Sequence, residues 1–404
     1  MLPMDNPILP YAWGSRTAIA ELSGRPPSET PEAELWMGAH PKAPSRVRVN
    51  GEWYALDRLI AADPASVMGD EAAARFPEGL PYLFKVLAAA APLSIQAHPD
   101  KDQAGEGFRR ENEQGIPLSA PHRNYRDDNH KPELITALTP FWGLNGFRFP
   151  SEICSLLGAA CPVALGEMTA RLAAEPEDAA LRFFYQGLME LDAGRREAAL
   201  SEALEWAGRT RSAEAEWVRR LHEFWPGDMG VLSPLYLNLV CLAPGQSMYL
   251  PAGQLHAYLD GTGIELMANS DNVLRGGLTP KHMDIPELMR VLRFSAGPPK
   301  VRDGLPAALP EEGAFEAVEF FHETPAREFL LSMLRIPAGR ARSHVVTGPE
   351  ILLCVSGEAE VRSGGMAPVR VFRGHSVLAT GRAGSVHLSG PAVLYRAAVP
   401  PAAR

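Results

Sequence analysis

A block of helical sequence, residues 150–228, interrupts a chain of 404 residues whose other parts are of β type. The block is rich in Ala, Leu, Glu and Arg, and its apolar residues recur at helical spacing, as at Leu200, Ala203, Leu204 and Ala207. The flanking segments carry apolar runs bounded by Gly and Pro, such as residues 81–88, 93–99 and 234–250, which are typical of strands. We therefore expect a mainly β protein with an α-helical insertion of roughly four or five helices.

The β-rich segments on the two sides of the block have evenly spaced turn signals, which favours two small barrels or jelly rolls. We predict a discontinuous first β domain from residues 1–149 and 231–283, with residues 150–230 as the helical insertion. Residues 284–404 are predicted to form a linker helix followed by a second β domain.

Composition limits the partners of the chain. The 39 Lys and Arg residues against 48 Asp and Glu residues leave a net charge of −9, which argues against nucleic acid or an anionic membrane as partner. The longest apolar run, residues 86–95, is far shorter than the ~18–20 residues that span a bilayer. The start shows no secretory signal, and the four cysteines form no CxxC pair, so we expect a cytoplasmic protein with reduced, buried cysteines.

The sharpest local signal is the pattern G-x5-P-x-G-x2-H between Gly245 and His256. It resembles the second signature motif of cupin barrels. Gly245 is expected to open a hairpin, Pro251 and Gly253 to shape the next turn, and His256 to enter the following strand with its side chain facing the barrel interior.

Other residues could complete a metal site with His256. Alternation along a strand places Gln96 and His98 on one face, and Glu133 starts another predicted strand. This set of nitrogen and oxygen donors suits Zn²⁺, with Mn²⁺, Fe²⁺ or Co²⁺ possible. Spacing alone leaves open that Gln96 and His98 only satisfy a buried polar network.

Five separated motifs, in order, resemble those of type I phosphomannose isomerases: residues 11–15, 34–45, 93–101, 127–138 and 250–284. The resemblance implies two cupin-type (jelly-roll) barrels and a helical domain inserted into the first barrel. It implies one Zn²⁺ per chain, with Gln96, His98, Glu133 and His256 as its ligands. His344, His375 and His387 lie outside such a motif, so we expect a degenerate C-terminal cupin without metal.

Basic residues inside the motifs indicate an anionic substrate: Lys85, Lys131, Arg275 and Lys281. Ser94 alternates with Gln96 and is predicted to face the same cavity. Tyr258 is expected on the face of His256, and Trp13 at the cavity mouth, where plain packing is an equally good explanation for the tryptophan.

The resemblance implies reversible interconversion of D-mannose 6-phosphate and D-fructose 6-phosphate through a cis-enediol. It also implies that Arg275 belongs to the active site. Such a reaction needs an acid–base group and stabilisation of a developing oxyanion. We predict that His130, Lys131 and Glu265 share the proton transfers, with Glu265 on the next inward strand after His256. Which of them takes the C2 proton stays open.

Three other functions fit parts of this pattern. A cupin isomerase of a related hexose phosphate and a non-catalytic sugar-phosphate sensor are the main alternatives. A cupin Fe²⁺ oxygenase is disfavoured by Gln96, because such enzymes usually use His and one carboxylate. The expected partner is a hexose 6-phosphate alone, bound by a monomer.

Overall fold

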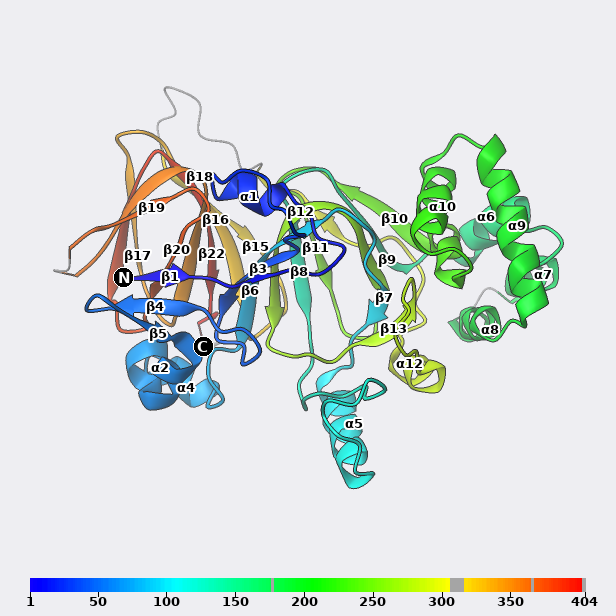
Figure 1. Cartoon of the computed structure of the whole chain (residues 1–404), viewed down its shortest axis with the longest axis horizontal. Helices are drawn as coiled ribbons and strands as arrows, with labels where there is room; N and C mark the ends of the chain where they lie inside the picture. The colour runs from blue at the N-terminus through cyan, green and yellow to red at the C-terminus, as the bar shows by residue number, and fades with distance from the viewer. Residues whose placement is uncertain (176–177, 306–315, 365–366, 402–404) are drawn as a thin grey trace.

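The computed structural model describes residues 1–175, 178–305, 316–364 and 367–401, which form two antiparallel sheets and a group of helices beyond one of them (Figure 1). In the described chain each sheet has eleven strands. The first sheet contains β2 (Ile8–Leu9), β3 (Glu34–Gly38), β6 (Tyr82–Ala89), β7 (Ile95–Ala97), β8 (Glu133–Ala137), β9 (Phe141–Phe147), β10 (Leu237–Leu242), β11 (Ser247–Leu250), β12 (His256–Ala268), β13 (Leu274–Gly277) and β14 (Val301–Arg302). The second contains β1 (Leu2–Asp5), β4 (Arg46–Val49), β5 (Glu52–Ala55), β15 (Val318–His322), β16 (Leu330–Ile336), β17 (Ala341–Val345), β18 (Glu350–Ser363), β19 (Val369–Phe372), β20 (Ser376–Ala379), β21 (Ser385–Ser389) and β22 (Ala392–Ala398).

Strand β12 organises the first sheet. It follows the helical block in the chain and pairs with β6, β7, β8 and β9, which all precede the block. The first sheet is thus built from both sides of the helical block. Every residue of β6 is buried, as its unbroken apolar run around Lys85 requires of a strand covered on both faces. The predicted strands around residues 82–89 and 95–97 are thereby confirmed.

The two sheets do not follow the predicted division, in which all of residues 1–149 belong to the first β domain. Leu2 of β1 lies opposite Leu378 of β20, and β1 also pairs with β4, so these early strands extend the C-terminal sheet. The physical reason is non-local. Met4 and Val47 bury their side chains in the same apolar cluster as Leu378, and a strand's own pattern does not say which sheet will cover it.

The two sheets share one apolar cluster and are joined by a buried tyrosine. The cluster takes side chains from β6 and β12 of the first sheet and from β16, β18 and β22 of the second. The hydroxyl of Tyr82 lies 3.2 Å from the carbonyl of Pro349 and 3.1 Å from that of Ala397. The relative position of the sheets is therefore held by apolar burial and by a satisfied polar group.

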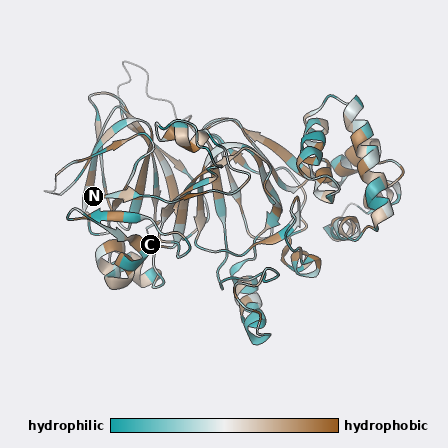
Figure 2. Cartoon of the chain, in the orientation of Figure 1, coloured by the Kyte–Doolittle hydropathy of each residue, from teal (hydrophilic) through white to brown (hydrophobic). Residues whose placement is uncertain are grey.

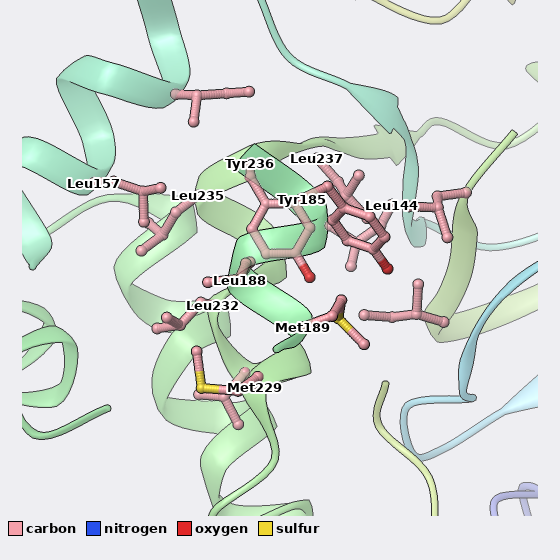
Figure 3. Packing of buried hydrophobic residues seen from close by; sticks show 14 of the residues in the cluster. Leu144, Leu157, Tyr185, Leu188, Met189, Met229, Leu232, Leu235, Tyr236 and Leu237 are labelled. Carbon is pink, nitrogen blue, oxygen red and sulfur yellow. The ribbon is translucent and has the colours of Figure 1, made fainter. Parts of the chain in front are cut away.

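The predicted helical block consists of α6 (Pro150–Ala160), α7 (Gly166–Ala174), α8 (Asp178–Met189), α9 (Ala193–Arg209) and α10 (Ala213–Phe224). Their apolar faces pack with η1 (Met229–Leu232) and α11 (Ser233–Tyr236), and Figure 3 shows Leu157, Tyr185 and Tyr236 in this core beside Leu144 and Leu237 of the first sheet. Residues 234–236, expected as strand, are thus helical. The helix predicted after residue 284 is α12 (Ile285–Val291).

Several helices were not predicted: α1 (Ala18–Leu22), α2 (Leu56–Ala62), α3 (Pro64–Met68), α4 (Asp70–Arg75) and α5 (Lys101–Glu113). Helix α5 is mostly hydrophilic and projects from the first sheet (Figures 1 and 2). A capping box starts it, because Asp100 and Gln103 each accept a hydrogen bond from the other's main-chain N–H. The spacing of Asp100 and Gln103 is the signal from which the start of α5 could have been predicted.

Two further expectations concern membrane-spanning helices and the cysteines. Within the described residues, no helix is long and apolar enough to cross a bilayer. All four cysteines are free, and Cys161 and Cys354 are buried, but Cys241 is exposed, so the expectation of uniform burial is wrong there.

Candidate metal centre and substrate cavity

His98, Glu133 and His256 meet at the ends of three strands of the first sheet. His98 follows β7, and Glu133 and His256 are the first residues of β8 and β12. The Nε2 atom of His98 lies 3.2 Å from Glu133 Oε1, and that of His256 lies 3.4 Å from Oε2, with all three side chains 1% exposed. One ligand atom from each residue lies within 4.8 Å of the others. The predicted convergence of these three residues is observed.

The hydrogen bonds of the two imidazoles determine their tautomers. His98 Nδ1 lies 2.7 Å from the carbonyl of Asn272, and His256 Nδ1 lies 2.9 Å from the carbonyl of Gln254. Because a carbonyl only accepts, each Nδ1 carries the proton and each Nε2 has a free lone pair. Burial lowers the pKa of His98 to about 4, so its ring is neutral at pH 7.

The donor set fits a divalent metal ion. Both Nε2 atoms are buried and have no hydrogen-bond partner of acceptable geometry among the described residues. Burial raises the pKa of Glu133, but Lys131 and the two imidazoles outweigh it and hold that pKa well below its usual value. Two imidazoles whose Nδ1–H groups bond main-chain carbonyls, together with one carboxylate, are a typical zinc environment. Gln96 lies directly opposite His256 in the β7–β12 pairing, where its amide can add an oxygen donor.

A cavity of about 780 Å³ opens next to this cluster. Ten of the predicted site residues line it: Trp13, Lys85, Ser94, Gln96, Lys131, Glu133, Tyr258, Glu265, Arg275 and Lys281. His130 is not among the described residues that line it; instead its Nε2 atom lies 2.7 Å from Glu328 Oε1. His98 and His256 do not line the cavity either, but they lie against Glu133, so among the predicted site residues His130 alone lies apart from both the cavity lining and the cluster.

A buried ion cluster forms one wall of the cavity. Lys85 Nζ lies 2.8 Å from Glu265 Oε2 and 3.7 Å from Glu34 Oε1. Burial lowers the pKa of Lys85, but Glu265 and Glu34 together raise it above its usual value, so the ammonium stays charged. Burial raises the pKa of Glu265 although Lys85 opposes this shift.

Glu265 was expected on the strand after that of His256, and this expectation is wrong. Both residues belong to the thirteen-residue strand β12. Residues nine apart on a regular strand face opposite sides, but the β9–β12 pairing shifts register between Tyr258 and Asp260. Such an irregularity adds one residue to the count and lets both side chains face the cavity region.

Two neighbours of the His98–Glu133–His256 cluster are bonded to Glu133. Lys131 Nζ lies 2.9 Å from Glu133 Oε1, and the Tyr258 hydroxyl donates to Oε2 over 3.3 Å. Tyr258 and Lys131 therefore orient the carboxylate as well as line the cavity.

The rim of the cavity is cationic. Burial is the main cause that lowers the pKa of Arg275, and repulsion from Arg126 lowers it further. The pKa of Lys281 is likewise lowered by burial first and then by repulsion from Arg275. Neither side chain forms an ion pair with a described residue. The rim is consequently suited to a dianionic group such as a phosphate monoester.

Comparisons with known proteins point to one enzyme family. The family model "Phosphomannose isomerase type I, catalytic domain" matches residues 1–149. Mannose-6-phosphate isomerase from Escherichia coli strain K12 is 42% identical over 367 residues, which are 90% of this chain and 91% of the relative. The human mannose-6-phosphate isomerase is 33% identical over 88% of both chains.

The chain belongs to the mannose-6-phosphate isomerase family.

Solved structures of this isomerase family have the same fold. A crystal structure of a phosphomannose isomerase variant from Salmonella typhimurium aligns with a TM-score of 0.90 at 39% identity and covers 99% of both chains. A structure of mannose 6-phosphate isomerase bound with zinc and yttrium aligns with a TM-score of 0.89 at 38% identity, covering 99% of this chain and 100% of the other.

Five residues that line the cavity of this isomerase were not predicted from the sequence: Glu34, Trp36, His40, Lys42 and Arg126. The first four lie in the motif at residues 34–45, where strand alternation already places residues 34 and 36 on one face. Trp36 Nε1 donates to Glu34 Oε2 over 2.6 Å, and Glu34 Oε1 lies 3.7 Å from Lys85 Nζ, which links this strand to the Lys85 cluster.

Proposed function

We propose that this chain is an aldose–ketose isomerase that interconverts D-mannose 6-phosphate and D-fructose 6-phosphate, with one Zn²⁺ per chain. The proposal is carried by the two buried Nε2 atoms on either side of Glu133, which have no hydrogen-bond partner among the described residues. They lie next to a cavity whose Arg275 and Lys281 form no ion pair within the described part of the chain. Family membership supports the same substrate pair.

Gln96, His98, Glu133 and His256 would hold the ion. Bound there, Zn²⁺ would act as a Lewis acid towards substrate oxygens. Tyr258 and Lys131 bind the carboxylate of Glu133 and keep it in place for this purpose.

Arg275 and Lys281 bind the phosphate, and Arg126 and Lys42 add positive charge at the same rim. Anchoring the substrate by a group remote from its reacting carbons orients C1 and C2 towards the buried end of the cavity. Ser94 and Trp13 line the same cavity and contribute a hydroxyl and an aromatic surface.

Proton transfer converts the open-chain aldose into the ketose. A base removes the C2 proton while O1 gains one, which yields the cis-enediol; loss of the O2 proton and protonation of C1 then give fructose 6-phosphate. We assign this acid–base work to Lys131 and Glu265, with the charged Lys85 ammonium next to Glu265 offsetting negative charge on the oxygens. We assign no proton transfer to His130, because Glu328 holds its ring outside the cavity lining.

We further propose that the two sheets are cupin-type jelly-roll barrels and that residues 150–230 form a helical insertion domain of the first. Residues 284–404 would supply most of the second, degenerate barrel. The chain would work as a cytoplasmic monomer on a hexose 6-phosphate.

The test is a coupled assay for fructose 6-phosphate formation from mannose 6-phosphate, before and after verified metal removal. We expect activity that is lost with the metal and restored by Zn²⁺. Undiminished turnover without metal would contradict the role of Zn²⁺. Binding of mannose 6-phosphate without turnover would support a sensor instead, and faster turnover of another aldose phosphate would support the related isomerase.

A further inference from the structure

Asn272 lies in the loop between β12 and β13 and is completely buried. Its Oδ1 atom accepts hydrogen bonds from the main-chain N–H groups of Arg126 (2.7 Å) and Asp127 (3.3 Å). Its Nδ2 atom donates to the carbonyls of Asp127 and Asn129, both over 2.8 Å. The amide therefore uses its full hydrogen-bonding capacity on a loop some 145 residues earlier in the chain.

Asp127 strengthens the same connection from the other side. Its Oδ1 atom accepts from the hydroxyl of Ser270 over 2.7 Å, and its Oδ2 atom accepts from the main-chain N–H of Asp271 over 2.8 Å. The loops at residues 126–129 and 270–272 are thus cross-linked by side-chain bonds from both directions. Buried networks in which every member is satisfied hold one geometry.

The cross-linked loops reach the metal centre through the main chain of Asn272. Its carbonyl oxygen lies 2.7 Å from His98 Nδ1, and this bond leaves the Nε2 lone pair facing Glu133 and His256. The other loop leads directly to Lys131, which lies 2.9 Å from Glu133. One side chain therefore acts on two parts of the site that are far apart in sequence.

We propose that Asn272 is a positioning residue of the metal centre. Its amide locks the two loops together, so that its own carbonyl sets the tautomer and ring orientation of His98 and the partner loop sets the position of Lys131. The inference rests on the proposed metal function. Partners that orient a metal-bound imidazole typically change affinity by about 10- to 100-fold when they are lost.

The test measures metal binding directly. Zn²⁺ affinity is determined by chelator competition in the parent protein and in Asn272→Ala, and the visible spectrum of the Co²⁺-substituted proteins reports ligand geometry. We expect Asn272→Ala to bind Zn²⁺ about 10- to 100-fold more weakly and to shift the Co²⁺ spectrum. Ser270→Ala removes a hydroxyl that donates to Asp127 and to the Asn129 carbonyl and accepts from the main-chain N–H of Asn272. It leaves the Asn272 amide in place and should therefore weaken binding by a smaller factor.

Ser332→Ala is the matched control, because Ser332 is a fully buried hydroxyl that bonds Glu319 and Arg396 in the second sheet. It should lower the melting temperature without changing Zn²⁺ affinity or the Co²⁺ spectrum. If Asn272→Ala does not fold, Ser270→Ala decides: parent-like affinity in the folded variant overturns the inference. Parent-like affinity and spectrum in folded Asn272→Ala overturn it too, while leaving the isomerase function intact. A parent protein that binds no Zn²⁺ would overturn both proposals.

Discussion

Lys85 and Glu265 lie directly opposite each other on β6 and β12, and their charged groups are 2.8 Å apart although 180 residues separate them in the chain. Both side chains are almost completely buried, so removing Lys85 would leave the Glu265 carboxylate without its ion-pair partner, whereas removing Glu265 would leave Lys85 with the more distant Glu34. The pair therefore couples the chemistry of the cavity to the stability of the central strands.

Glu265→Gln tests the proposed acid–base role. We expect kcat to fall by about 10²- to 10⁴-fold, because the variant cannot exchange a proton, while Zn²⁺ content stays unchanged. Steady-state kinetics and metal analysis measure both. Glu350→Gln is the control, since it removes an equally buried carboxylate that pairs with Arg396 in the other sheet. Equal losses in the two variants would assign the effect to stability.

Arg275→Ala tests the cationic rim. Loss of this charged group, which is proposed to contact the substrate phosphate, should lower kcat/KM by about 10²- to 10³-fold without loss of bound Zn²⁺. Arg220→Ala provides the comparison, because Arg220 pairs with Asp260 outside the cavity lining. Parent-like kcat/KM in Arg275→Ala would remove this residue from substrate recognition.

His322 should make stability depend on pH. Burial lowers its pKa to about 4 in the folded protein, whereas an unfolded histidine titrates near ~6.5, so the unfolded chain binds more protons between these values. The free energy of unfolding should therefore fall as the pH drops from ~6.5 to ~4, by up to about 3 kcal/mol from this residue. Urea titrations of the parent and His322→Gln at several pH values isolate the contribution, and parallel curves would contradict it.

The contact between the sheets can be tested with two buried tyrosines. Tyr82→Phe removes a hydroxyl that bonds two carbonyls of the second sheet and should lower the free energy of unfolding by about 1–3 kcal/mol. Tyr395→Phe removes an equally buried hydroxyl that has no hydrogen-bond partner among the described residues, so it should be nearly neutral or stabilising. A larger loss in Tyr395→Phe than in Tyr82→Phe would contradict this assignment.

Much of the architecture could be predicted because its signals are local. Helical periodicity located the block around residues 150–228, and short apolar runs located strands such as β6. The spacing of the motif at residues 245–256 placed His256 at the start of a strand. The capping pair of α5 was equally local and was overlooked.

Other features depended on pairing across the sheets. The sequence by itself determined which residues are candidates for the site, because residue type and local periodicity are written along the chain. Only the tertiary structure decided that β1 joins the C-terminal sheet, that Lys85 pairs with Glu265, and that His130 binds Glu328 outside the cavity. Those outcomes depend on strand register, on one irregularity in β12 and on the burial of charges by distant segments, and none of these quantities is a property of a local window of sequence.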